Sequence, residues 1–134
     1  MIRPLAAGDR EAAVALWHAC GLTRPWNDPH ADFSRAAEGP SSAVLGAFED
    51  TTLIGSAMVG HDGHRGWVYY LGVHPEHRQR HLGRALMDAC EAWVRERGVP
   101  KIEVMVRGDN AATRGFYEAL GYGLEDVVVY SRRF

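Results

Sequence analysis

A short basic turn is the part of this sequence best suited to chemistry. Arg78, Arg80 and Arg84 lie close together, with His77 and His81 beside them. The turn follows the apolar run WVYYLGV and precedes an amphipathic segment, so it is predicted to lead from a strand into the N-terminus of a helix. Backbone N–H groups and the helix dipole bind phosphate at such a place, and arginines strengthen the binding. The turn is therefore predicted to hold an anion.

The glycine pattern of the turn narrows the kind of anion. Gly83 would let a phosphate approach the backbone closely. However, the turn has neither the Gly-x-x-x-x-Gly-Lys-Ser/Thr loop of an ATP or GTP site nor the Gly-x-Gly-x-x-Gly loop of a dinucleotide site. A nucleoside triphosphatase and a Rossmann fold are thus disfavoured. The alternative is a helix whose solvated first turn happens to be rich in arginine.

The composition of the chain indicates its cellular compartment and disfavours some classes of binding partner. Of its 134 residues, 46% are hydrophobic and 24% charged, so one domain spanning the whole chain can form a core. A net charge of −2 argues against nucleic-acid binding. Cys20 and Cys90 occupy apolar, helix-like positions and are predicted to be unpaired core residues in a reducing compartment. With no signal peptide and no run of ~20 apolar residues, the sequence predicts a cytoplasmic protein without membrane contact.

Hydrophobic periodicity and turn residues predict the element order β-α-α-β-β-β-α-β-α-β. Asp9 and Asp28 are predicted to cap the first two helices, and the second helix is predicted to end at Glu38. The third helix is predicted to cross over between two parallel strands, giving an α/β domain with a mixed central sheet flanked by helices. The predicted strands are residues 2–5, 43–48, 53–59, 67–73, 101–106 and 127–134.

Two segments together resemble a known family. LGVHPEHRQRHLGRAL is similar to the acyl-CoA-binding segment of the GNAT superfamily of N-acetyltransferases, whose pattern is Arg/Gln-x-x-Gly-x-Gly/Ala. Arg78 and Gly83 match the two ends of that pattern. DNAATRGFYEALGY is similar to the family's second signature at Asn110, Tyr117 and the Gly121–Tyr122 pair. The phrases RPWNDP, DGHRG and YYLGVHPE resemble the YpeA-type subgroup of small acetyltransferases. The resemblance implies the GNAT fold over nearly the whole chain.

This resemblance implies direct transfer of an acetyl group from acetyl-CoA to a primary amine of a small molecule or protein. Backbone N–H groups at the strand end, with Val73 the best donor, are expected to polarise the thioester carbonyl, and Gly72 is expected to mark a bulge that frees them. His81 departs from the pattern because it replaces the first glycine. The residues expected to bind acetyl-CoA are Leu71, Gly72, Val73, Arg78, Gln79, Arg80, His81, Leu82, Gly83, Arg84, Asn110 and Tyr117.

Tyr117 matches the family's general acid, since a phenol can pass a proton to the departing CoA thiolate. The alternative is that Tyr117 packs in an apolar stripe with Phe116 and Leu120. Asn110 is expected to contact the cofactor, to cap its helix, or to do both.

The general base is less well defined. Family members that act on ribosomal protein N-termini often have glutamate where this chain has Met105, which cannot take a proton. Glu103 lies on the same strand face and is the predicted base, directly or through water, although a surface glutamate beside Lys101 is an equal alternative. An already neutral amine needs no base. Further candidates are Asp62, His61 and His64.

The acceptor site is expected beside the segment RPWNDP, because the family often shapes its acceptor pocket between the first two helices. Trp26 and Asn27 are predicted to touch substrate, and a helix cap with a buried tryptophan is the alternative. Asp62 and Tyr69 complete the predicted substrate residues. Tyr69 and Tyr70 point to opposite strand faces, so only one of them is expected to line the cleft. No acidic funnel is visible, which disfavours polyamine acceptors.

Other features suggest what else the chain could bind. A metal site is not predicted. His74, His77 and His81, joined by His61 and His64, span a predicted loop and the basic turn without a cysteine or a compact carboxylate partner. The run VVVYSRRF is predicted to be an edge strand that pairs protomers in a homodimer. Replacement of the family's glutamate and glycine motivates an alternative function, a non-catalytic acyl-CoA-binding regulatory module.

Overall fold

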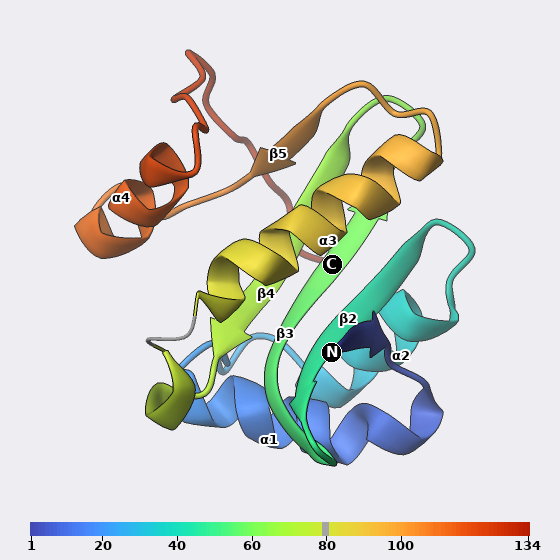
Figure 1. Ribbon diagram of the computed structural model, residues 1–134. Helices are drawn as coiled ribbons and strands as arrows, with labels where there is room; N and C mark the ends of the chain where they lie inside the picture. The colour runs from blue at the N-terminus through green and yellow to red at the C-terminus, as the bar shows by residue number, and fades with distance from the viewer. Residues whose placement is uncertain (79–80) are drawn as a thin grey trace.

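A computed structural model describes residues 1–78 and 81–134 (Figure 1). Its strands form one sheet in the order β1-β2-β3-β4-β5. Neighbouring strands are antiparallel except for β4 and β5, which are parallel and are joined through α3. The predicted mixed sheet and crossover helix are therefore confirmed.

The strands are β1 (Ile2–Pro4), β2 (Ser42–Glu49), β3 (Thr52–His61), β4 (Gly66–Val73) and β5 (Ile102–Val104). The helices are α1 (Arg10–Ala19), α2 (Pro29–Glu38), α3 (Leu82–Glu96) and α4 (Ala111–Ala119). Two 3-10 turns, η1 (Ala7–Asp9) and η2 (Pro75–His77), precede α1 and α3.

Helices cover both faces of the sheet. In Figure 1, α3 crosses one face, whereas α1 and α2 lie against the other. One apolar cluster packs α3 on the sheet through residues such as Leu86 and Met87, and a second packs α1 and α2 through Trp17 and Phe33. The buried Trp17 indole donates a hydrogen bond of 3.0 Å to the buried Ser56 hydroxyl. This bond satisfies the polar groups that the two elements bring into the core.

The first two helices begin where the sequence predicts, but their caps differ. The Asp28 carboxylate accepts hydrogen bonds from the backbone N–H groups of His30 and Ala31, so this residue caps α2 as expected. The Asp9 carboxylate instead accepts from the Ala6 N–H and pairs with Arg3. The prediction that Asp9 caps α1 is therefore wrong in its mechanism: this carboxylate fixes the η1 turn that precedes α1.

A bulge interrupts β4 close to the position predicted for it. Ser56 pairs with Gly72 and Met58 with Tyr69, so Ala57 faces two residues, Tyr70 and Leu71. Tyr70 has a φ of 51°, which the extra residue imposes on the strand. Gly72 itself serves packing, since a Cβ there would lie 2.8 Å from a Leu22 methyl group and 3.0 Å from the Cys20 sulfur.

The predicted last strand is absent. Residues 127–134 have no strand structure, and Val128 and Tyr130 are largely exposed. Their β propensity is not enough, because a strand forms only where a neighbouring strand pairs with it. The fifth strand is also shorter than predicted, since β5 ends at Val104 and the chain leaves the sheet at Met105.

Both cysteines are free thiols, which confirms that they form no disulfide. Cys90 is buried in the cluster under α3. Cys20 is only half-buried, and its thiol donates to the Val73 carbonyl at 3.3 Å. Within the described ranges, no helix combines the length and apolar character that crossing a membrane requires.

Candidate active site

The strands β4 and β5, the last two strands of the sheet, part after a short stretch of pairing. Their pairing ends with Val68 and Val104, so residues 69–73 of β4 have no partner in β5. Beside this split lies a groove of about 1040 Å³, which we call the acyl groove. Tyr69, Glu103 and Tyr117 are among its lining residues. The unpaired stretch includes the backbone predicted to polarise a carbonyl, and a strand edge without a neighbour leaves N–H groups for a ligand.

The basic turn begins at the end of β4. The Arg78 guanidinium donates from Nε to the Val73 carbonyl at 3.2 Å, which holds this side chain against the strand end. His81 precedes α3 in the left-handed conformation, with a φ of 55°. A glycine adopts that conformation without cost, so the departure from the family pattern places a side chain where the backbone favours glycine. Leu82 and Gly83 form the first turn of α3, Arg84 is exposed, and Gln79 and Arg80 lie outside the described residues.

Gly83 has a packing role that the sequence alone does not reveal. A Cβ at this position would lie 3.1 Å from two carbons of the Phe116 ring, so the α3 N-terminus touches α4 directly. Phe116 and Tyr117 contact each other edge to face with ring centroids 5.1 Å apart. The two segments that resemble the family signatures are thus brought together.

Tyr117 lies at the inner end of this contact. Its side chain is 8% exposed, and burial raises the pKa of its phenol to about 12, with a further contribution from the Cys90 thiol. The hydroxyl makes no hydrogen bond within residues 1–78 and 81–134, which leaves it available to a ligand in the acyl groove. The phenol is therefore protonated at neutral pH and unpaired.

Asn110 caps α4, since its side-chain oxygen accepts from the Thr113 N–H at 3.1 Å. The capping role expected of it is confirmed. Any contact with acetyl-CoA would be additional.

Glu103 lines the acyl groove and is paired with Arg65 at 3.3 Å. Both side chains are partly exposed, so the pair is open to a ligand and to water. Met105 follows the end of β5 and is also exposed. Of the other candidate bases, His61 accepts at Nδ1 from the Gly63 N–H at 3.1 Å, and His64 is exposed.

A second pocket, of about 560 Å³, adjoins the acyl groove; we call it the acceptor pocket. Trp67 and Tyr69 line both cavities, so they mark the place where the two meet. Three of the predicted substrate residues, Asn27, Asp62 and Tyr69, line this pocket together. Trp26 does not line it: this residue is 51% exposed, with the Arg133 guanidinium 5.9 Å from its ring centroid. The alternative of a buried Trp26 is therefore wrong.

Tyr70 also lines the acceptor pocket, so the expectation that only one tyrosine would do so is wrong. Its ring stacks on Trp17 with centroids 4.0 Å apart, as a core residue would. The bulge breaks the simple alternation of faces and lets its hydroxyl reach the pocket wall.

The sequence profile of the Acetyltransferase (GNAT) family matches residues 10–122. The chain belongs to the GNAT acetyltransferase family. It is 44% identical over 132 residues to an acetyltransferase of Pectobacterium atrosepticum, covering 98% of this chain and 94% of that one. The structure of AAC(6')-Iy in complex with the bisubstrate analog CoA-S-monomethyl-acetylneamine superposes with a TM-score of 0.84 at 22% identity, covering 100% of this chain and 98% of that chain. A PaiA N-acetyltransferase from Thermoplasma acidophilum, in complex with coenzyme A, superposes with a TM-score of 0.79 at 20% identity, covering 96% and 92%.

This GNAT protein is an N-acetyltransferase that uses acetyl-CoA as co-substrate. Its residues fit that ligand. The unpaired edge of β4 offers backbone donors beside a groove, and the first turn of α3 offers N–H groups for a pyrophosphate next to the exposed Arg84. The apolar side chains of Val104 and Val106 also line the groove.

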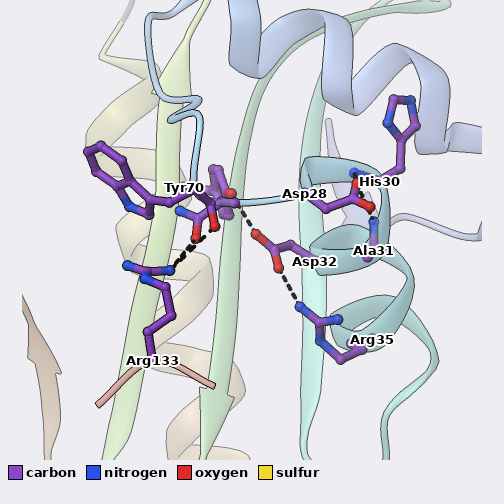
Figure 2. A network of polar contacts seen from close by, with 9 residues as sticks. Asp28, His30, Ala31, Asp32, Arg35, Tyr70 and Arg133 are labelled. Carbon is purple, nitrogen blue, oxygen red and sulfur yellow. Dashed lines mark hydrogen bonds and ion pairs between the residues drawn. The ribbon is translucent and has the colours of Figure 1, made fainter. Parts of the chain in front are cut away.

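This acetyltransferase also has a polar network between β4 and α2 that the sequence alone does not reveal (Figure 2). The Tyr70 hydroxyl donates to Asp32 at 2.7 Å, and Asp32 is also paired with Arg35. Burial and the Asp32 carboxylate raise the pKa of the Tyr70 phenol. The available signal in the sequence is Asp32 four residues after Asp28, the N-cap of α2, which brings two carboxylates to the N-terminal end of this helix.

Proposed function

We propose that residues 1–134 form one catalytic domain in which acetyl-CoA occupies the acyl groove and the amine enters from the acceptor pocket. The observation that carries this proposal is that Trp67 and Tyr69 line both cavities at the level where β4 and β5 part. An amine at that level would be next to the free edge of β4. Asn27, Asp62 and Tyr69 would contact the acceptor, with Trp26 at the rim.

Bound acetyl-CoA supplies the thioester whose acetyl group passes to the amine. Backbone N–H groups of Leu71, Gly72 and Val73 polarise a carbonyl oxygen, with Val73 the principal donor. The α3 N-terminus holds the pyrophosphate together with the side chains of the basic turn, namely Arg78, Gln79, Arg80, His81 and Arg84. When a phosphate is present, the Arg78 guanidinium either breaks its hydrogen bond to the Val73 carbonyl or keeps that bond and donates to the phosphate as well.

Tyr117 is the general acid for the departing CoA thiolate. Its pKa of about 12 keeps the phenol protonated at neutral pH, so the hydroxyl can donate a hydrogen bond to a thiolate as negative charge develops there. Because its hydroxyl has no hydrogen-bond partner among the described residues, no existing bond must break first.

Glu103 is the general base for the acceptor amine. Its carboxylate lies at the groove wall and is not buried, so it can take the amine proton directly or through a water molecule. The ion pair with Arg65 competes with this role, and an amine that arrives neutral would not need it.

Calorimetric titration with acetyl-CoA tests the acyl groove. We expect micromolar, saturable binding of acetyl-CoA and none of ATP. Arg78→Ala should weaken CoA by about tenfold and pantetheine much less, because only CoA carries the pyrophosphate. Arg95→Ala, an exposed arginine at the far end of α3, is the matched control and should change neither. Equal weakening of CoA and pantetheine would remove Arg78 from the pyrophosphate site.

We further propose that the protein acts in the cytoplasm and forms a homodimer. Two free thiols support a reducing compartment. The exposed apolar side chains of residues 127–134 support pairing with a second protomer, since this segment of high β propensity pairs with no strand among the described residues. Analytical ultracentrifugation of the protein and of Val128→Glu tests the dimer, which the charged variant should dissociate.

A further inference from the structure

We propose that the acceptor carries a second positive charge, separate from the amine that is acetylated, and that Asp62 binds it. This inference rests on the proposed function, because it names the class of amine that the acceptor pocket selects. The argument starts from the charges that line this pocket. They belong to Asp32 and Asp62 on the acidic side and to Arg35 on the basic side.

The two carboxylates differ in how their charge is balanced. Asp32 is paired with Arg35 and accepts from the Tyr70 hydroxyl, so its charge is offset inside the protein (Figure 2). The donors to Asp62 are neutral: the backbone N–H groups of Arg65 and His64, each at 2.8 Å, and the Trp67 indole at 3.4 Å. Within the described part of the chain, no lysine or arginine side chain forms an ion pair with Asp62.

Among the described residues, Asp62 is therefore a fixed negative charge without a cationic partner at the pocket. The same hydrogen bonds, first from the Arg65 N–H and then from the His64 N–H, lower its pKa, so the carboxylate is ionised at every pH at which the enzyme would work. Burial, and after it the Asp62 carboxylate, raise the pKa of the Tyr69 phenol, so the charge of Asp62 is felt at this pocket residue. The Arg65 side chain, the nearest cation in sequence, is engaged with Glu103.

The walls beside Asp62 suit a cation as well. The indole of Trp67 and the phenol ring of Tyr69 line the pocket next to the carboxylate. Aromatic faces attract ammonium and guanidinium groups, and this attraction adds to that of a nearby carboxylate. A carboxylate with aromatic walls thus favours a cationic group over a neutral one.

The strand geometry sets the spacing within the acceptor. Trp67 holds Asp62, whereas Tyr69 lies two residues farther along β4, at the level where β4 and β5 part. Two residues of a strand span about 6.6 Å. The second charge should therefore be separated from the acetylated nitrogen by about five or six bonds, as in a linear diamine of four or five carbons. The sequence alone disfavours polyamine acceptors, because Asp32 and Asp62 are distant in the chain. Only the folded protein brings the two carboxylates to one pocket.

The test compares two amines that differ only in the second charge, 1,4-diaminobutane and 1-aminobutane, by thiol release from acetyl-CoA. The wild-type enzyme should favour the diamine by about tenfold in kcat/KM, mainly through KM. Asp62→Asn should reduce this preference to less than twofold while leaving acetyl-CoA binding unchanged. Asp50→Asn, at the opposite end of the β2–β3 hairpin, is the matched control and should keep the full preference, since asparagine also tolerates its φ of 54°.

The outcomes separate this inference from the proposed function. A protein that binds acetyl-CoA but treats the two amines alike, or that accepts neither, overturns the inference alone. A preference that survives in Asp62→Asn overturns the role of Asp62. A protein that does not bind acetyl-CoA overturns the proposed function itself, which the calorimetric titration detects independently of any amine.

Discussion

At the residue scale, the environment of each side chain decides what chemistry it can do. Tyr117 and Glu103 both line the acyl groove, yet the phenol is buried and unpaired in the described residues, whereas the carboxylate is partly exposed and bound to Arg65. Burial keeps the phenol protonated, so it is the natural donor of a proton. The exposed carboxylate remains in contact with water and can accept one.

Tyr117→Phe should lower turnover about 100-fold, because it removes the donor to the departing thiolate while keeping the ring. Acetyl-CoA affinity should change less than twofold, since the lost hydroxyl has no hydrogen-bond partner in the described structure. Thiol release and calorimetry measure the two effects. Tyr130→Phe, an exposed tyrosine of the tail, is the control. Wild-type turnover in Tyr117→Phe would reject the acid role.

Glu103→Gln should lower kcat/KM about 100-fold at pH 7, because the amide cannot take the amine proton. The loss should shrink toward pH 9, where more of the acceptor is already neutral. A pH series of thiol release checks both points, with Glu96→Gln at the exposed end of α3 as control. A loss that does not change with pH would instead point to the ion pair with Arg65 as a structural contact.

At the element scale, α3 and α4 contact each other, and residues of both helices line the acyl groove. The first turn of α3 touches Phe116, and this contact requires Gly83. The parting of β4 and β5 then leaves room beside Tyr117. Two glycines within these helices test the contact, since only one of them faces a neighbour.

Gly115→Ala should stabilise the protein by about 1 kcal/mol, because alanine favours the helix and a Cβ there would meet nothing within 4 Å. Gly83→Ala has a similar helical advantage, but its Cβ would lie 3.1 Å from the Phe116 ring, so we expect no gain or a loss. Urea unfolding measures both free energies. The double variant Gly83→Ala/Phe116→Leu should recover part of the gain. Equal stabilisation by the two alanine variants would mean that Phe116 and α4 shift to admit the new methyl group at position 83 at no cost in free energy.

At the scale of the whole molecule, acidic groups tie segments together and make stability depend on pH. Asp9 links β1 to the η1 turn by accepting from Arg3 and from the Ala6 N–H. These bonds, that of Arg3 first, lower the pKa of Asp9 below its ordinary value of 3.8. A carboxylate with a lowered folded-state pKa contributes stability above its unfolded pKa and loses it as the pH falls through the folded value.

The free energy of unfolding should therefore decrease as the pH falls below about 4. Asp9→Asn should be less stable than the wild type near neutral pH, and its stability should fall less steeply in acid. Urea unfolding between pH 6 and 3 tests this, with Asp88→Asn on the exposed side of α3 as control. Part of the slope should remain, because the pKa values of Asp62 and Glu125 are lowered as well. Parallel curves for Asp9→Asn and the wild type would reject the link.

The sequence by itself determined the helices, the hairpin and the two signature segments, because their signals are local. Asp28 before a proline, the apolar spacing around Leu86 and Asn110 before α4 act within a few residues. Tyr117 was predicted as the general acid from the family resemblance, and that role stays a prediction. The family resemblance joined these local signals into one fold, which the comparison with relatives confirms.

Tertiary structure decided what depends on residues far apart in the chain. The bulge at Tyr70, its bond to Asp32 across 38 residues and the meeting of two pockets at Tyr69 require a sheet already paired and covered by α2. The missing strand at residues 127–134 has the same cause, since strand propensity is realised only beside a partner. Local preference fixes elements, whereas the shape and charge of the acceptor pocket arise from long-range packing.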